Sequence, residues 1–326
     1  MRKLILILTF LLACGHCFAF GDGGGIVFGK LRLKTDIRRL DPDPEPIADF
    51  KTLIVPIKRA GNLIIVEAQV DSLEGNFVFD TGAPNLVLNE TYFRYYPKIE
   101  EHEVGGINGA TGGFTTYVHN FKILDLQFSR LTADVTDLSQ IENSRHIKVL
   151  GLLGTRLFAK FSVTVDLFKN VLYIQKTEKD GSIAEGEKIF HDRMLVSPFR
   201  YMNDVIYLKT AVDGSDFWFV FDSAAETNLL DYDRMKKVVR KMQVISRSKV
   251  AGVGGMGFEV LFVRFDNLSV GGHLFSPNRA IVTDLEKMGR AYNNSIDGIL
   301  GYDFFSHGIF TINFVKKEFE MYIYNN

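Results

Sequence analysis

Asn76-Phe77-Val78-Phe79-Asp80-Thr81-Gly82-Ala83 is the stretch that decides the fold, because the chain repeats it as Phe217-Trp218-Phe219-Val220-Phe221-Asp222-Ser223-Ala224-Ala225. In each copy, an apolar run typical of a buried strand ends at an aspartate that small residues follow. One copy alone would indicate only a turn, since Asp and Gly are turn formers. Two copies deliver two carboxylates from core strands into the interior. Because an unpaired carboxylate is costly to bury, the repeat predicts that the two carboxylates work together.

The elements after each copy also keep the same order in both halves of the chain. A short apolar strand comes first, then a helical stretch, then a glycine-rich hairpin, and finally an apolar pair that leads to glycine and an aromatic tail. These elements are residues 86–88, 89–101, 105–109 and 151–158 in the first half, and residues 229–230, 231–243, 252–255 and 298–305 in the second. The repeat predicts two similar lobes in one chain.

The fold class follows from the residues between these repeated elements. From Thr52 almost to the end, short apolar runs rich in Val, Ile, Phe and Tyr are spaced by glycines. We therefore expect a mainly β, bilobal protein with a pseudo-twofold internal repeat and short helices, one in each half. The aromatic residues Phe158, Phe161, Phe304, Phe305 and Phe310 should lie in the core. The expected domains are a signal peptide (1–19), a lead-in or removable pro-segment (20–47), an N-terminal lobe (48–178), a connector (179–187) and a C-terminal lobe (188–326).

The N-terminus has the layout of a secretory signal peptide. Two basic residues precede the apolar run 4–13, and residues 17–19 form a small-x-small cleavage site, so we expect export. Alternatively, residues 11–14 are a bacterial lipoprotein signal, with a lipid anchor on Cys14. Cys14 and Cys17 are the only cysteines, so cleavage after residue 19 leaves no thiol. A secreted chain without disulfides favours the bacterial periplasm or cell envelope.

Composition excludes several classes of function. The 326 residues carry 38 basic and 39 acidic side chains. This balance gives no net positive charge to attract the phosphate backbone of a nucleic acid. The apolar run 4–13 is far shorter than the roughly 20 residues that span a bilayer, so no transmembrane segment is expected. The seven histidines form no His-x-x-x-His pair, and we expect neither a metal nor another cofactor. There is also no Gly-x-Ser-x-Gly nucleophile motif.

Two carboxylates at the ends of core strands suggest an aspartic dyad. Like-charge repulsion leaves such a pair sharing one proton, so that one carboxylate acts as base and the other as acid. The pair can then activate a water molecule for attack on a peptide carbonyl. Thr81 and Ser223 carry small hydroxyls able to bond between the two loops, and Gly82 allows a close backbone approach.

With these residues the sequence resembles an aspartic protease of the retropepsin/pepsin kind, in a bacterial form with both lobes on one chain. The resemblance covers about residues 52–324. It implies a bilobal β-barrel fold, Asp80 and Asp222 as the catalytic pair, and bracing elements at residues 152–154 and 299–301. It also implies flaps at the glycine hairpins, with Gly106, Ile107, Gly254 and Gly255 over an extended peptide or protein substrate. With both lobes on one chain, we expect a monomer.

The sequence departs from the family pattern around the second loop. Ala224 stands where the family has glycine, so an inactive peptide-binding protein of the same fold is the alternative to an endopeptidase; a structural envelope protein is a third. Ala83 and Ala225 replace residues whose hydroxyls hold the carboxylate pKa down in pepsin-like enzymes. We therefore predict a raised pKa for the pair and cleavage at mildly acidic to near-neutral pH. Glu226 is expected to face solvent or cap the loop rather than contact substrate.

Overall fold

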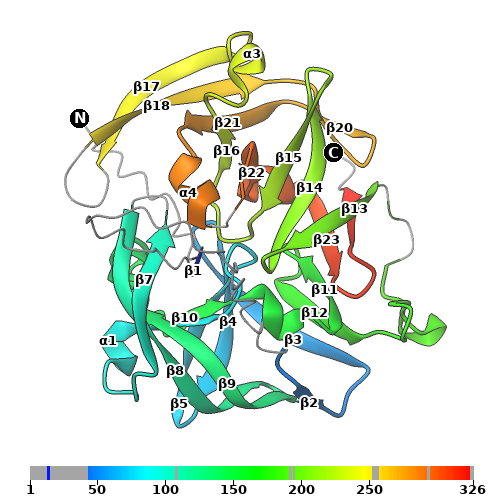
Figure 1. Cartoon of the computed structure of the whole chain (residues 1–326). Helices are drawn as coiled ribbons and strands as arrows, with labels where there is room; N and C mark the ends of the chain where they lie inside the picture. The colour runs from blue at the N-terminus through cyan, green and yellow to red at the C-terminus, as the bar shows by residue number, and fades with distance from the viewer. Residues whose placement is uncertain are drawn as a thin grey trace, which may run out of the picture.

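The computed structural model describes residues 13–14, 43–106, 109–190, 193, 195–251, 257–291 and 294–323. It is mainly β, as the sequence predicts, with a few short helices. In Figure 1 the strands of the first half lie in the lower part of the molecule and those of the second half in the upper part. None of the helices in these described ranges is long and apolar enough to cross a membrane.

The first half is built around the strand that ends at Phe79. This strand, β5, pairs in parallel with β10 and antiparallel with β4, while β6 lies between β10 and β9. The register places Phe79 opposite Leu153, so the apolar pair predicted as a brace lies beside the end of the aspartate strand. The strands are β2 (Pro46–Ala48), β4 (Leu63–Val70), β5 (Leu73–Phe79), β6 (Leu86–Asn89), β7 (Glu100–Gly106), β8 (Gly109–Ile123), β9 (Leu126–Thr136) and β10 (Gly151–Leu153).

The second half repeats these pairings. Strand β15, which ends at Phe221, pairs in parallel with β22, and Phe221 lies opposite Leu300. Strand β16 lies between β22 and β21 with the same directions as its counterpart in the first half. The strands are β14 (Val205–Val212), β15 (Ser215–Phe221), β16 (Asn228–Asp231), β17 (Gln243–Ala251), β18 (Gly257–Phe265), β19 (Leu268–Val270), β20 (His273–Phe275), β21 (Asn278–Thr283) and β22 (Gly298–Leu300).

A third sheet takes strands from both halves. Its order is β3–β12–β11–β23–β24–β13, with every neighbouring pair antiparallel. Two of these strands continue beyond the shared sheet, because β3 also pairs with β4 and β13 also pairs with β14. The strands are β3 (Thr52–Ala60), β11 (Phe161–Asp166), β12 (Val171–Lys176), β13 (Leu195–Met202), β23 (Gly308–Asn313) and β24 (Glu318–Ile323).

One face of the shared sheet is apolar and packs against the strand that ends at Phe221. Phe310 and Phe319 are fully buried on this face, with ring centroids 6.2 Å apart. Phe221, the residue before Asp222, packs on both of them, at 5.3 Å and 5.0 Å. In the first half Phe79 packs edge-on against Phe158 at 5.3 Å. The five aromatic residues predicted for the core are all at most 1% exposed: Phe158, Phe161, Phe304, Phe305 and Phe310.

The two predicted helices are much shorter than the stretches 89–101 and 231–243. Helix α1 spans only Glu90–Phe93. Pro97 follows it before β7, and because proline disfavours a helical conformation at the residue before it, the helix cannot easily extend further. Helix α3 spans Lys236–Val239, and the chain is already in β17 at Gln243. The sequence analysis did not anticipate the remaining helices, α2 (Ser139–Arg145), α4 (Glu286–Ala291), α5 (Tyr302–Phe305), η1 (Thr155–Phe158) and η2 (Glu185–Glu187).

Most of the predicted signal peptide and lead-in lies outside the described residues. Strand β1 (Ala13–Cys14) is described, and it pairs antiparallel with β7, with Cys14 opposite Val104. Export and a lipid anchor on Cys14 remain predictions. At the end of the lead-in, β2 pairs with β9, with Ile47 opposite Gln127.

Candidate active site

Asp80 and Asp222 occupy equivalent positions at the ends of β5 and β15. The Asp80 N–H donates to the Leu153 carbonyl at 3.1 Å, and the Asp222 N–H donates to the Leu300 carbonyl at 3.0 Å. Glycine after each apolar pair is required by packing: a Cβ on Gly154 would lie 2.2 Å from the Asn85 carbonyl oxygen. The predicted bracing elements therefore hold both aspartate loops at the backbone.

Each loop also binds its own carboxylate. Asp80 Oδ1 accepts a hydrogen bond from the Gly82 N–H at 2.9 Å. Asp222 Oδ1 accepts from the N–H groups of Ala224 at 2.8 Å and Ala225 at 3.2 Å. Backbone donors aimed at one oxygen fix the orientation of each carboxylate and leave the other oxygen turned away from the loop.

The two loops are joined by a reciprocal set of hydrogen bonds through Thr81 and Ser223. Thr81 Oγ1 accepts from the Ser223 N–H at 2.9 Å and donates to the Phe221 carbonyl at 2.9 Å. Ser223 Oγ accepts from the Thr81 N–H at 3.0 Å and donates to the Phe79 carbonyl at 2.8 Å. Both side chains are 1% exposed. Each hydroxyl thus bonds the backbone of the opposite half, as the sequence predicts.

The Asp80 and Asp222 side chains meet between the loops. Both residues are 0% exposed, and the two carboxyl groups lie close enough for the negative charge of Asp222 to act on Asp80. Burial raises the pKa of the Asp80 carboxyl well above its usual range, and the negative charge of Asp222 raises it further. Burial also raises the pKa of Asp222, to about 7, although the N–H groups of Ala224 and Ala225 act to lower it. Two neighbouring carboxyl groups with raised pKa values have the electrostatics that allow them to share one proton.

Both pKa values are raised, as the sequence predicts, but the main cause is not the predicted one. The prediction rested on missing hydroxyls at Ala83 and Ala225, whereas burial is the largest cause for both aspartates. The buried Oδ2 atoms of Asp80 and Asp222 receive no hydrogen bond from a donor among the described residues. These two oxygens are the polar groups left available for a bound molecule.

Ala224 fits its position without backbone strain. Neither it nor Gly82 is among the residues with positive φ, so the loop does not need glycine for its conformation. The Ala224 methyl is 1% exposed and packs in an apolar cluster with Ala83, Val87 and Leu152 of the first half. The amide N–H that a glycine would offer to Asp222 is present and bonded.

A hairpin from each half contacts the aspartate loop region of the other half. The β3–β4 hairpin donates from Asn62 Nδ2 to the Glu226 carbonyl at 3.3 Å, and the Glu226 carboxylate forms an ion pair with Arg145 at the end of α2. In the second half, the Asp204 carbonyl in the β13–β14 hairpin accepts from Thr155 Oγ1 at 2.5 Å. Arg156 Nε lies 3.8 Å from Asp204 Oδ2.

These contacts correct the prediction for Glu226. Its side chain is only 17% exposed and faces Arg145 rather than solvent, because α2 brings that arginine to the second loop. Sequence reasoning also missed Arg145, Thr155 and Asp204. No motif marks them; the only signal is that Thr155 directly follows the predicted brace and Glu226 directly follows the repeated stretch.

The predicted flap residues lie mostly outside the described residues. Gly106 ends β7 and pairs with Gly109 of β8, which agrees with a hairpin at this position. Ile107, Gly254 and Gly255 are not described, so their role as flaps stays a prediction. Strands β17 and β18, which flank the second glycine stretch, pair antiparallel up to Ala251 and Gly257. In the described part of the chain, no group of three His, Cys, Asp or Glu side chains could hold a metal ion.

Comparison with known proteins adds one match. A search of curated proteins finds none similar to this chain. The family model described as aspartyl protease matches residues 208–304, a range that begins in β14, contains Asp222 and ends in α5. The second half of this chain is therefore similar to the aspartyl protease family.

Proposed function

We propose that this protein is an aspartic endopeptidase that hydrolyses peptide bonds with water, using Asp80 and Asp222 as one catalytic pair and no metal. The observation that carries the proposal is the buried pair of neighbouring carboxyl groups whose two loops are joined by hydrogen bonds through Thr81 and Ser223. The match of residues 208–304 to the aspartyl protease model supports the same conclusion. Burial of two carboxyl groups in contact is costly for stability, which favours a catalytic reason for keeping them.

Both pKa values are raised, so the two carboxyl groups hold the shared proton as one pair. The proposed reaction starts with that proton on Asp80. In the proposed reaction the Asp222 carboxylate takes a proton from water as the water oxygen bonds to the peptide carbonyl carbon. Asp80 gives its proton to the carbonyl oxygen, which forms a diol. Asp222 then protonates the leaving nitrogen as the C–N bond breaks, and a diol hydroxyl returns a proton to Asp80.

The repeated strand pairings favour a two-lobe arrangement in which each half supplies one aspartate. The two halves have parallel β5–β10 and β15–β22 pairs in matching register. We propose that the substrate is an extended peptide bound between the lobes, since an extended strand can satisfy its backbone against the hairpins. Because both carboxylates are 0% exposed, the reaction needs a more open conformation in which peptide and water reach the Oδ2 atoms. Export to a bacterial envelope and a monomeric state remain part of this proposal.

The test is cleavage of a broad peptide library by the purified protein. Asp80→Asn and Asp222→Asn should each lower the cleavage rate by at least about 100-fold, because an amide can neither accept the proton of water nor share one with its partner. Asp166→Asn is the matched control: Asp166 is 1% exposed, and its Oδ1 accepts from the N–H groups of Phe168 and Lys169, a role that an amide oxygen can keep.

Two results would contradict the proposal. If Asp80→Asn cleaves as fast as the wild type, the pair is not the catalyst. If the wild type binds peptides but cuts none, the inactive peptide-binding alternative is favoured. Ala224→Gly would then be the variant to test for activity, since Ala224 is the departure from the family pattern.

A further inference from the structure

The outer face of the shared sheet is polar and yet buried. Residues on β11 and β23 alternate, so Val163 and Phe310 face the apolar core while Thr164 and Thr311 face the other way. The polar residues of this outer face are at least nine-tenths buried: Ser162, Thr164, Gln175, Thr311 and Asn313. Buried polar groups are expensive unless they are hydrogen-bonded, so this face differs from an ordinary solvated sheet surface.

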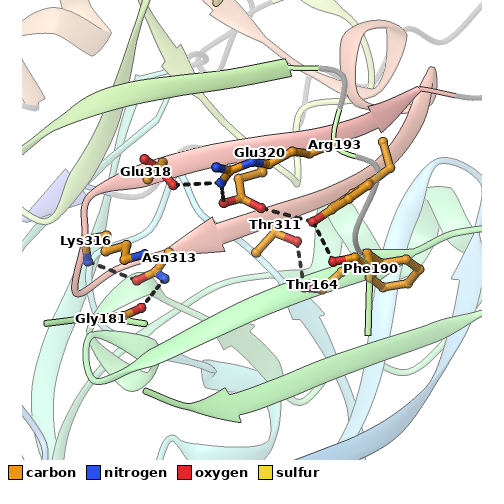
Figure 2. A network of polar contacts seen from close by, with 10 residues as sticks. Thr164, Gly181, Phe190, Arg193, Thr311, Asn313, Lys316, Glu318 and Glu320 are labelled. Carbon is orange, nitrogen blue, oxygen red and sulfur yellow. Dashed lines mark hydrogen bonds and ion pairs between the residues drawn. The ribbon is translucent and has the colours of Figure 1, made fainter. Parts of the chain in front are cut away.

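The connector between the halves covers this face without filling the space. It crosses the sheet through Gly181 and η2 to Phe190, and the Gly181 carbonyl accepts from Asn313 Nδ2 at 2.8 Å. Between connector and sheet lies a cavity of about 480 Å³ lined by hydroxyl, amide and charged groups. This volume is within the range of sites for small molecules. Figure 2 shows part of its lining, with Thr164 and Thr311 joined by a dashed line, Phe190 beside them, and the charged group around Arg193 above.

The charges that line the cavity are balanced by neighbours. Arg193 Nη1 lies 2.6 Å from Glu320 Oε1 and 3.4 Å from Glu318 Oε1. Lys188 Nζ lies 2.5 Å from Glu185 Oε2. Hydrogen bonds from Ser182 are the main cause of the lowered pKa of the Asp180 carboxyl, and the positive charge of Lys316 lowers it further. A lining whose cations lie near carboxylates gives no preference for a strongly charged ligand.

The neutral groups keep hydrogen-bonding capacity. Thr164 and Thr311 share one bond, at 2.7 Å between their Oγ1 atoms. Two hydroxyls that share one bond still have one hydrogen to donate and lone pairs to accept. The rings of Phe190 and Tyr322, with centroids 5.1 Å apart, add an apolar wall, and both residues line the cavity. Mixed donors and acceptors beside aromatic rings suit a molecule that carries hydroxyls on a carbon frame.

We propose that this cavity binds a small, uncharged, polyhydroxylated molecule of saccharide or polyol type, held by strands from both halves of the chain. The site is independent of the proposed peptidase activity. Thr164 and Thr311 lie on the opposite face of the sheet from Phe310, against which the Asp222 strand packs. The threonines are binding residues, and no step of peptide hydrolysis is assigned to them.

The experiment titrates the purified full chain with N-acetylglucosamine, glucose and myo-inositol, and separately with inorganic phosphate. Binding is measured by ligand-observed NMR and by the rise in melting temperature, because a ligand that binds only the folded state stabilises it. We expect saturable binding of at least one neutral probe. Thr164→Val and Thr311→Val should each weaken it at least tenfold, because valine keeps the side-chain shape and removes the hydroxyl.

Two controls separate binding from folding. Thr311→Ser keeps a hydroxyl and should retain binding, and Thr210→Val removes a buried strand hydroxyl that does not line the cavity and should bind as the wild type does. The proposal is overturned if none of the neutral probes binds, if the valine variants bind as tightly as the wild type, or if phosphate binds and the neutral probes do not.

Discussion

Two small hydroxyl side chains connect the halves of this molecule at its centre. Thr81 and Ser223 each donate to a carbonyl of the opposite aspartate strand and accept from the N–H of the other residue. All four bonds are buried, so none can be replaced easily by water. The position of each carboxylate relative to the other therefore depends on the hydroxyl groups beside them.

Removing one of these hydroxyls should cost stability and activity together. Ser223→Ala leaves the Phe79 carbonyl and the Thr81 N–H without a buried partner, and each such loss costs about 1 to 3 kcal/mol. We expect the free energy of unfolding to fall by about 2 to 6 kcal/mol in denaturant titrations, and the cleavage rate to fall with it. Thr210→Val is the control, since its one hydroxyl bond is long, 3.4 Å to the Phe217 carbonyl. A change below about 0.5 kcal/mol for Ser223→Ala would contradict this role.

The sequence predicts the residues of the pair well because their signal is local and repeated. Apolar residues, Asp, a hydroxyl and two small residues occur together twice, and the structure brings both copies into contact. Glu226 was predicted wrongly for the opposite reason. Its environment is set by Arg145, which comes from another half of the chain and from a helix with little apolar periodicity. Interactions of that kind depend on tertiary structure and leave no local pattern.

At the scale of elements, two hairpins connect the halves, because each contacts residues of the other half. The β3–β4 hairpin reaches the second aspartate loop, and the β13–β14 hairpin reaches the start of η1 in the first half. Arg59 on β3 also lies over the Tyr302 ring, 5.0 Å from its centroid. Tyr302 N–H in turn donates to the Ala225 carbonyl at 2.9 Å, so the second loop lies among contacts from both halves.

Breaking the ion pair at the second loop tests this arrangement. Arg145→Ala leaves the Glu226 carboxylate, whose pKa burial already raises, without its cation. We expect unfolding free energy to fall by about 1 to 3 kcal/mol, less than for a fully buried pair because both side chains are partly exposed. The charge-reversed double variant Arg145→Glu with Glu226→Arg should recover part of the loss.

An exposed ion pair provides the comparison for this experiment. Lys98 and Glu101 lie 2.8 Å apart with side chains 52% and 72% exposed, so Lys98→Ala should change stability by less than about 0.5 kcal/mol. If Arg145→Ala has no larger effect than Lys98→Ala, the contact between the halves at Glu226 has no structural role.

Element types were predicted better than element lengths. The strands β6 and β16 lie where apolar runs predict them, and three apolar residues within the predicted helical stretch 231–243 are buried: Met235, Val238 and Val239. The helices themselves last only one turn, because strand pairing of β7 and β17 begins soon after them. Helix α2 was missed because its seven residues include one buried apolar side chain, Ile141, and so show no periodicity.

At the scale of the whole molecule, the shared sheet determines how the halves meet. Its strands come from both ends of the chain, and such pairings of distant segments cannot be assigned from local sequence. Alternation along β11 and β23 does show which side chains share a face. It does not show that the connector buries the polar face and leaves a cavity there.

The buried pair should also make global stability depend on pH. The pKa values of Asp80 and Asp222 are higher in the folded chain than the ordinary value of 3.8, so the folded state holds more protons than the unfolded state. Their contribution to stability is therefore present at acidic pH and is lost as pH rises from about 4 through about 7. Asp222→Asn should raise the melting temperature relative to wild type more at pH above about 7 than at pH about 4. A pH-independent difference would contradict this, and Asp166→Asn is the control.

The most direct test of the central claim is an NMR titration of the ¹³C carboxyl resonances of Asp80 and Asp222, which needs no substrate. Two groups that share a proton should titrate as a coupled pair, with the last proton lost near or above neutral pH. In Asp222→Asn, the pKa of Asp80 should fall but stay above its ordinary value, because the neighbouring negative charge is gone while the burial of Asp80 remains. Independent titration of both carboxyl groups near the ordinary value of 3.8, unchanged by the substitution, would show that they are not a proton-sharing pair.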